Sequence, residues 1–375
     1  MIDLLFVSGV DQGGSYMSTL RLASALGERG HRIAMVHERS DRPVITRVSR
    51  RLNNLEVKLA DHPPGGAARW VARRIGRRIE PQAAASFELS RAAVIENAAP
   101  ALLDRHPSAV VVSSVSRVAW RRLHADARAR RVPVVLYLRE EFLLGHLALG
   151  VNPDAVFANS ESLAAGARAA GFDPALVPSI VDVSESQVDS TRRAVLVVNP
   201  TAHYGIDVVV PLAEANPDVP FVLQESAQLM PAERQRVEQV TRRLSNVELR
   251  SFAPNPRDVF RDARLLLAPY TDALASNRPR VVLEAQANGI PVLGATTAGL
   301  VETVGPGGVL LDLGAGIEAW STVLREIWDD AHRYVALSAA AREHAARPDV
   351  DPDHIVDMFE RTVTGMFGGR ADRRT

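Results

Sequence analysis

Short apolar runs bounded by turn residues recur along this 375-residue chain, and stretches with the period of a helix lie between them. Buried strands of a parallel sheet appear in sequence as continuous apolar runs, and crossover helices supply the periodic segments between them. The pattern therefore predicts an α/β fold with parallel sheets. The candidate strands are 4–7, 32–37, 110–113, 134–138 and 155–158 in the first half, and 194–198, 221–224, 247–251, 265–268, 290–293 and 309–311 in the second.

The chain is longer than a single hydrophobic core usually grows, so two domains are expected. The two sets of strands predict an N-terminal domain over 1–180 and a second domain over 194–348, with a polar interdomain linker over 181–193. Apolar residues at helical spacing predict a final helix over 349–367. The last residues, 368–375, are expected to be a disordered tail.

Composition excludes several classes of protein. Lys and Arg together number 44, as do Asp and Glu, so no net charge favours nucleic acid. The absence of cysteine excludes disulfides, thiolate catalysis and cysteine-ligated zinc. The N-terminus lacks the pattern of a signal peptide, and no apolar run is long enough to span a bilayer. We therefore expect a cytoplasmic protein, whose oligomeric state the sequence does not indicate.

Adjacent glycines, Gly13 and Gly14, lie between the first expected strand and a helix. Glycines let backbone N–H groups approach a ligand closely, and the start of a helix favours negative charge. The loop is not G-x-G-x-x-G, and no acidic residue ends the second expected strand as it does in dinucleotide-binding folds. The loop is therefore either a diphosphate contact or a simple tight turn.

Glu140 follows the expected strand at 134–138, at the edge where α/β sheets bind their ligands. It is the candidate for positioning a substrate hydroxyl or for acid–base catalysis. The alternative is a solvated loop carboxylate.

The most specific stretch runs from 270 to 311. A helix carrying Glu284 ends at Asn288 and Gly289, a short apolar strand follows, and a loop rich in Gly, Ala and Thr comes next. Together with the segment from Asn199 to Gly205, this order resembles the donor-binding half of GT-B glycosyltransferases, in particular the large retaining family 4 (glycosyl transferases group 1). The resemblance implies two Rossmann-like domains facing each other across a cleft that holds the active site.

The resemblance also implies a nucleotide-diphosphate sugar as the donor, a hydroxyl acceptor, and neither an obligatory metal nor another cofactor. It places Glu284 at the ribose hydroxyls of the donor, although a glutamate that only stabilises the helix start is the alternative. Arg278 and Arg280 suit a departing diphosphate, although two exposed arginines before a helix are the alternative. Arg280 is the catalytic candidate beside Glu140. The expected donor-binding residues are Gly13, Gly14, Asn199, Tyr204, Gly205, Ser276, Asn277, Arg278, Glu284, Ala298 and Gly299.

Three positions depart from the family pattern. Tyr204 stands where a phosphate-binding lysine is usual, Ser276 replaces a sugar-binding glutamate, and Pro279 replaces a glycine whose N–H contacts the diphosphate. Each change removes a conventional contact with the donor. They indicate either an unusual donor, such as a deoxysugar, or a loss of activity.

The sequence therefore favours a hexosyl- or deoxyhexosyltransferase that acts with retention in natural-product, glycolipid or polysaccharide biosynthesis. A catalytically silent scaffold or auxiliary partner of another enzyme is the alternative, and a nucleotide-sugar epimerase is a further one. A basic amphipathic helix expected over 68–79 either contacts an anionic membrane or is a solvated surface helix.

Overall fold

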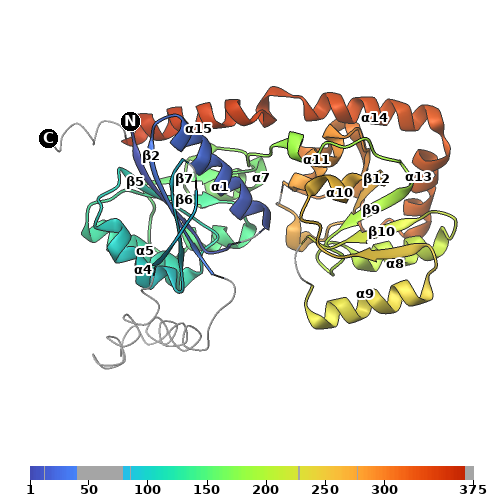
Figure 1. Ribbon diagram of the computed structural model, residues 1–375, viewed down its shortest axis with the longest axis horizontal. Helices are drawn as coiled ribbons and strands as arrows, with labels where there is room; N and C mark the ends of the chain where they lie inside the picture. Colours follow the sequence, from blue (N-terminus) through green and yellow to red (C-terminus); the bar gives the residue numbers. More distant parts are fainter. Residues whose placement is uncertain (12, 40–78, 85, 227–228, 277, 368–375) are drawn as a thin grey trace. The chain divides into compact units, whose positions relative to one another are not determined.

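The computed structural model describes residues 1–11, 13–39, 79–84, 86–226, 229–276 and 278–367, which form two compact units (Figure 1). Unit 1 contains Met1–Ile180 together with the residues from Asp353 onward, and unit 2 contains Val181–Pro352. The segment expected as a linker is bonded into unit 2, since Thr191 and Arg193 donate backbone hydrogen bonds to the carbonyls of Arg261 and Asp262. No helix of the described residues combines the length and apolar character needed to cross a bilayer.

Unit 1 is built on a sheet with the strand order β3-β4-β2-β1-β5-β6-β7-β8, in which β3 alone among these strands is antiparallel to its neighbour. The strands are β1 (Asp3–Ser8), β2 (Arg32–Glu38), β3 (Ile79–Gln82), β4 (Glu88–Ala92), β5 (Ala109–Ser113), β6 (Val134–Leu138), β7 (Ala155–Ala158) and β8 (Pro174–Leu176). The central strands are buried on both faces, which explains their continuous apolar sequences.

The sequence analysis missed β3, β4 and β8 because none of them carries a continuous apolar run. Strand β3 contains Pro81 and lies at the sheet edge, where a missing N–H is tolerated. Ile79, expected in the basic helix, opens this strand instead, and the rest of that helix, 68–78, lies outside the described residues. Strand β2 extends to the buried Glu38, so the expectation that no acidic residue ends the second strand was wrong.

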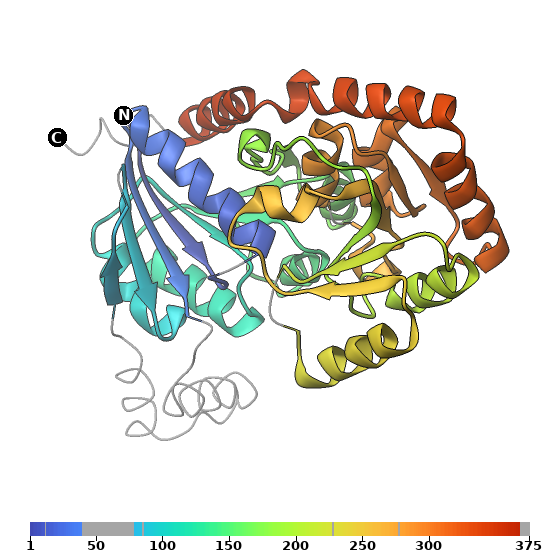
Figure 2. The ribbon, with the colours of Figure 1, turned by 45° about the vertical axis from the view of Figure 1, so that its right-hand side comes forward.

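Helices cover both faces of the first sheet (Figure 2). Helices α1 (Gly13–Glu28) and α15 (Pro352–Phe367) pack on one face, where the Phe359 ring lies 5.9 Å from that of Phe6 and 5.5 Å from that of Phe157. Helices α4 (Ile95–Leu103), α5 (Arg117–Ala129) and α7 (Glu161–Ala169) pack on the other, around the buried Trp120. After β6 come the short helices η1 (Glu141–Leu143) and α6 (Leu144–Leu147).

Unit 2 contains a parallel sheet with the order β11-β10-β9-β12-β13-β14. Its strands are β9 (Ala194–Val198), β10 (Phe221–Gln224), β11 (Val247–Arg250), β12 (Ala263–Ala268), β13 (Val292–Ala295) and β14 (Gly308–Leu311). Its α-helices are α8 (Ile206–Ala215), α9 (Pro231–Arg243), α10 (Pro256–Phe260), α11 (Arg280–Ala287), α12 (Ala298–Val304), α13 (Ile317–Asp329) and α14 (Ala331–Ala345), and its short helices are η2 (Val183–Glu185), η3 (Asp272–Leu274), η4 (Gly305–Gly307) and η5 (Pro348–Val350).

The strand expected at 290–293 lies two residues later, at Val292–Ala295. Ile290 is buried, but it lies in the turn after α11, where its N–H bonds the carbonyl of Ala285. Pro291 then has no N–H to give to the ladder.

Both sheets reverse their strand order beside their first strand, between β1 and β5 in unit 1 and between β9 and β12 in unit 2. Open α/β sheets bind ligands at the carboxyl ends of the strands that flank such a switch point. Ligand-binding loops are therefore expected after β1, β5 and β6 in unit 1, and after β9, β12 and β13 in unit 2.

Candidate functional sites

At the switch point of unit 2, Gly205 lets the loop after β9 meet the loop after β12. Gly205 has a φ of +79°, and a Cβ added there would lie 1.9 Å from the carbonyl oxygen of Pro269. The N–H of Thr271 donates to the carbonyl of His203, 3.1 Å away, and joins the same two loops. Gly205 is therefore required both by backbone conformation and by close packing.

Tyr204 fills this junction with an aromatic side chain. Its ring packs edge-on against that of Tyr270 with 5.1 Å between the centroids. Burial raises the pKa of both phenols, and the Tyr204 hydroxyl also bonds the side chain of Asn199. Asn199 has a positive φ of 59°, and its Oδ1 accepts a hydrogen bond from the N–H of Ser226 at 3.2 Å. The position expected to carry a cation thus carries a neutral, partly buried phenol.

Helix α11 brings Arg280 and Glu284 together. Arg280 Nη2 donates to Glu284 Oε1 at 2.8 Å across one helical turn, and the two side chains are 19% and 15% exposed. Arg280 Nε is buried and has no hydrogen-bond partner among the described residues. Pro279 precedes the helix in an extended conformation. The catalytic candidate and the ribose-binding candidate are therefore paired with each other.

The other expected donor residues of unit 2 lie around the start of α12. The N–H of Gly299 donates to the carbonyl of Ala275 at 2.6 Å, which holds the buried Ser276 beside the first turn that Ala298 opens. Arg278 Nε lies 3.9 Å from a carboxylate oxygen of Glu302, and its Nη2 lies 3.8 Å from one of Asp349. Asn277 lies outside the described residues.

Gly13 and Gly14 form the exposed first residues of α1. Gly13 has a φ of +87°, and nothing lies within 4 Å of an added Cβ. Its glycine is therefore required by the backbone conformation and not by crowding. This geometry fits both a ligand contact and a tight turn.

Glu140 lies beside two serines that the sequence analysis did not select. The Ser114 hydroxyl lies 2.8 and 2.9 Å from the two carboxylate oxygens of Glu140, and the Ser15 hydroxyl lies 2.9 Å from that of Ser114. Burial raises the pKa of Glu140, although the hydrogen bonds from Ser114 and Ser15 and the charge of Arg139 oppose the shift. The solvated-carboxylate alternative therefore does not describe this side chain.

Arg139 is a buried cation at the same edge of the first sheet, 3% exposed. Its guanidinium lies 4.1 Å over the ring of Tyr137, and its Nη1 reaches the carbonyl of Ser15 at 3.5 Å and the hydroxyl of Ser179 at 3.4 Å. Its Nε and Nη2 have no hydrogen-bond partner within the described part of the chain. Arg139 adds a positive charge to the surroundings of Glu140.

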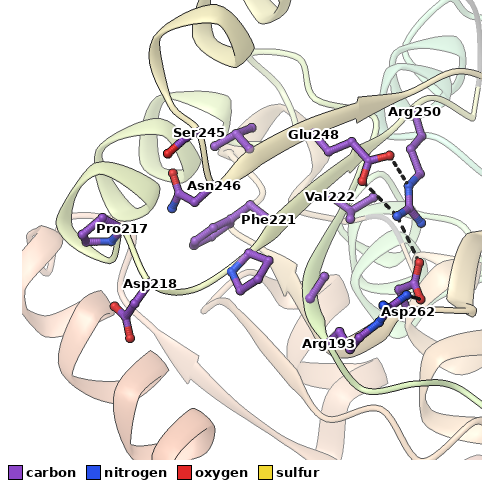
Figure 3. A pocket seen from close by; sticks show the side chains of 13 residues that line it. Arg193, Pro217, Asp218, Phe221, Val222, Ser245, Asn246, Glu248, Arg250 and Asp262 are labelled. Carbon is purple, nitrogen blue, oxygen red and sulfur yellow. Dashed lines mark hydrogen bonds and ion pairs between the residues drawn. The ribbon is translucent and has the colours of Figure 1, made fainter.

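A cavity of about 540 Å³ lies at the opposite edge of the second sheet, at the amino ends of β9, β10 and β11 (Figure 3). Four of its charged groups are paired within the lining, since Asp262 lies 2.7 Å from Arg193 and 3.0 Å from Arg250, and Arg250 lies 2.8 Å from Glu248. The fifth, Asp218, pairs with Arg325 outside the lining. The expected donor residues come from the other edge of the sheet. No group of three or more His, Asp or Glu side chains in the described residues is arranged to hold a metal ion.

Comparison with known proteins relates the second unit to enzymes that transfer sugars. Residues 197–330 match the family Glycosyl transferases group 1. Two curated relatives are both D-inositol 3-phosphate glycosyltransferases: that of Corynebacterium kroppenstedtii is 32% identical over 124 residues, which is 31% of this chain and 26% of the relative, and that of Thermobispora bispora is 41% identical over 105 residues, 27% and 24% respectively. The matches thus span about a quarter of these relatives.

Solved structures resemble the chain over almost its whole length. Anabaena HepE in complex with UDP and glucose aligns with a TM-score of 0.70 at 15% identity, covering 97% of this chain and 100% of that one. Sucrose-phosphate synthase from Thermosynechococcus elongatus aligns with a TM-score of 0.73 at 14% identity, covering 98% and 99%. The chain therefore has the GT-B fold, and its residues 197–330 match the family Glycosyl transferases group 1.

Proposed function

We propose that this protein transfers a sugar from a nucleotide-diphosphate donor to a hydroxyl acceptor. The observation that carries the proposal is that the expected donor-binding residues of unit 2 gather at the carboxyl edge of its sheet. These residues lie in or beside the loops after β9, β12 and β13, within the range 197–330 that matches the family. This is the edge at which open α/β sheets bind nucleotides.

In this proposal Glu284 binds the ribose hydroxyls, because a carboxylate accepts hydrogen bonds from both. Arg278 and Arg280 bind the diphosphate, since the planar guanidinium matches phosphate oxygens. Arg280 Nε, which has no hydrogen-bond partner among the residues that the structure describes, is a donor that Glu284 does not use. Asn199, Gly205, Ser276, Ala298 and Gly299 shape the surrounding loops, and Gly13 and Gly14 are the proposed contacts in unit 1.

The reaction breaks the bond between the anomeric carbon and the diphosphate oxygen, and forms a bond from the anomeric carbon to the acceptor oxygen. The acceptor proton passes to the departing diphosphate, so that atoms and charge balance. We propose that this occurs with retention and without an obligatory metal, and that the arginines stabilise the developing negative charge. The sugar is a hexose or deoxyhexose, and the product belongs to natural-product, glycolipid or polysaccharide biosynthesis.

The test is calorimetric titration of the purified protein with UDP, GDP, dTDP and ADP, repeated with Glu284→Ala and Arg280→Ala. Binding of one nucleotide that both substitutions weaken by about tenfold or more supports the donor site and identifies the base. Arg325→Ala is the matched control, because Arg325 and Asp329 form a similar i,i+4 ion pair on α13. That variant is expected to bind like the wild type.

Folded protein that binds none of the four nucleotides would overturn the proposal in favour of a silent GT-B scaffold. Once a nucleotide binds, its sugar conjugates are assayed for transfer in the presence of EDTA. Activity lost in EDTA and restored by a divalent cation contradicts the metal-independent part of the proposal.

A further inference from the structure

The side chains around Glu140 indicate how unit 1 could bind a ligand, an inference that extends the proposed function and rests on it. The carboxyl ends of β1, β5 and β6 meet at the switch point of unit 1, and each contributes to one small cluster. The loop after β1 and the start of α1 bring Gly9 and Ser15, the end of β5 brings Ser114, and the end of β6 brings Glu140. These residues are far apart in sequence and meet only through the fold.

Ser114 is held in an uncommon conformation. Its φ of 53° is in the left-handed region that residues with a side chain seldom adopt. Gly9 packs closely against Ser114, because a Cβ at Gly9 would lie 2.0 Å from the carbonyl oxygen of Ser114. The N–H of Gly9 also donates to the carbonyl of the preceding residue, Ser113, at 3.2 Å. Strained backbone that the surrounding packing enforces is concentrated at functional sites.

The hydrogen bonds of the cluster have a defined direction when Glu140 is ionised. A carboxylate only accepts, so the Ser114 hydroxyl, 2.8 and 2.9 Å from its two oxygens, donates to it. The Ser15 hydroxyl lies 2.9 Å from that of Ser114 and also forms a hydrogen bond with Glu140. Two hydroxyl protons do not occupy the roughly four lone-pair sites of a carboxylate, so Glu140 keeps acceptor capacity that the serines do not use.

Glu140 is also not neutralised by a close cation. Within the described part of the chain, Arg139 contributes charge but forms no ion pair with it, and its guanidinium lies over the ring of Tyr137 with Nη1 near Ser15 and Ser179. Glu140 is only partly buried, and the exposed Gly13 and Gly14 open the first turn of the helix that carries Ser15. The cluster is thus a polar, partly open acceptor at the edge where ligands bind.

We propose that Ser15, Ser114 and Glu140 form a subsite of unit 1 that binds a hydroxyl group of a neutral sugar or polyol. Glu140 accepts the ligand's O–H, and Ser114 is a positioning residue that orients the carboxylate. Under the proposed function this ligand is the acceptor. The ionised carboxylate of Glu140 accepts a hydrogen bond from the ligand's hydroxyl. Protonation of Glu140 reverses the direction of its hydrogen bond with Ser114 and removes the carboxylate acceptor.

The first experiment measures the titration of Glu140 by carbon-13 NMR of protein labelled at glutamate carboxyls, with Glu140→Gln for assignment. Ser114→Ala and Ser114→Gly both remove the hydroxyl, but glycine also relieves the left-handed backbone. Both are expected to shift the midpoint of Glu140 upward by about one pH unit, because a hydrogen bond to the charged form is lost. Ser24→Ala, a serine of the same helix α1 whose hydroxyl contacts Glu28 and Ser86, is the control.

The second experiment uses NMR to measure saturation transfer from the protein to D-glucose and to myo-inositol, with the same variants. Three results together support the subsite. The wild type shows saturation transfer to at least one probe, and this transfer falls as Glu140 is protonated. The transfer is reduced several-fold in Glu140→Gln and Ser114→Gly. An unshifted Glu140 midpoint in both Ser114 variants overturns the positioning role. Absent transfer in the wild type, or transfer unchanged in Glu140→Gln, overturns the hydroxyl site.

Nucleotide calorimetry on the same preparations separates the two proposals. A protein that binds no nucleotide but keeps the polyol signal refutes the donor site alone. A protein that binds a nucleotide and fails both NMR tests refutes the hydroxyl subsite alone.

Discussion

Replacing Asp262 with asparagine tests the ion cluster at the amino edge of the second sheet. Asp262 Oδ1 accepts from Thr191 Oγ1 at 2.7 Å. The same oxygen accepts from Arg193 Nη2 at 2.7 Å, and Oδ2 lies 3.0 Å from Arg250 Nη2 (Figure 3). The side chain is 12% exposed. Burial alone would raise its pKa, but the hydrogen bonds and the two positive charges outweigh burial and lower the pKa from 3.8 to about 2.

The magnitude follows from this shift. A pKa lowered by nearly 2 corresponds to about 2 kcal/mol of stability, since a change of one in pKa is about 1.4 kcal/mol. Because the folded-state pKa is the lower one, the contribution is complete well above pH 3.8 and is lost as the pH falls towards 2. Near pH 3 it should have fallen to about half of its full value.

The assay is urea denaturation of the wild type and Asp262→Asn between pH 3 and pH 7. Hydrogen exchange of β9 and β12 serves as the reading specific to unit 2. Asparagine keeps the shape and one acceptor oxygen but carries no charge, so the difference in unfolding free energy should narrow as the solution is acidified. Asp258→Asn is the matched control, because Asp258 pairs with Arg261 at a more exposed position and should change stability by less than about 0.5 kcal/mol.

A difference between wild type and Asp262→Asn that stays constant from pH 7 to pH 3 would refute the reasoning. The side chain would then act through its shape and not through its charge. A difference no larger than that of Asp258→Asn at pH 7 would show that the desolvation of three charged groups cancels their attraction.

Three further substitutions test other parts of the structure. Gly205→Ala should lower the stability of unit 2 by about 2–3 kcal/mol in urea denaturation, because of its positive φ and the Pro269 carbonyl 1.9 Å from the added Cβ. Asn246→Ala should cost about 2–3 kcal/mol in the same assay, since Asn246 Nδ2 lies 3.0 Å from each of three backbone carbonyls. Burial would raise the pKa of Glu360, but hydrogen bonds from His31 and Arg29 lower it, so Glu360→Gln should lower the melting temperature at pH 7 and have less effect as the pH falls below 4.

The buried strands could be predicted from sequence because burial on both faces leaves a continuous apolar run, as in β5 and β9. Strand β4 could not, because only Leu89 and Ala92 of its residues are buried. The same limit applies to β8, which has three residues and begins with Pro174. Strands at or near the edge of a sheet carry little of the apolar signal on which such predictions depend.

The site was predictable to the extent that local spacing determines it. Arg280 and Glu284 lie four apart on one helix, so their ion pair could have been predicted from the sequence, although each residue was assigned to the donor separately. The contacts of Ser114 with Glu140 and of Tyr204 with Tyr270 depend instead on which strands are neighbours. Only the sheet order supplies that information.

The charges at the switch point of unit 2 bear on the proposed reaction. At this proposed donor edge, Arg278 and Arg280 lie beside Glu302 and Glu284, so their formal charges cancel, and the neutral Tyr204 adds none. A diphosphate must therefore displace or share the carboxylate partners of these arginines, which weakens its binding compared with a site that holds an unpaired lysine. Affinity for the nucleotide then depends on whether hydrogen bonds from the ribose hydroxyls to Glu284 replace the ion pair that Glu284 loses when Arg280 binds the diphosphate. The departures from the family pattern thus predict weaker binding of free phosphate and diphosphate than of a whole nucleotide, and do not by themselves indicate a dead site.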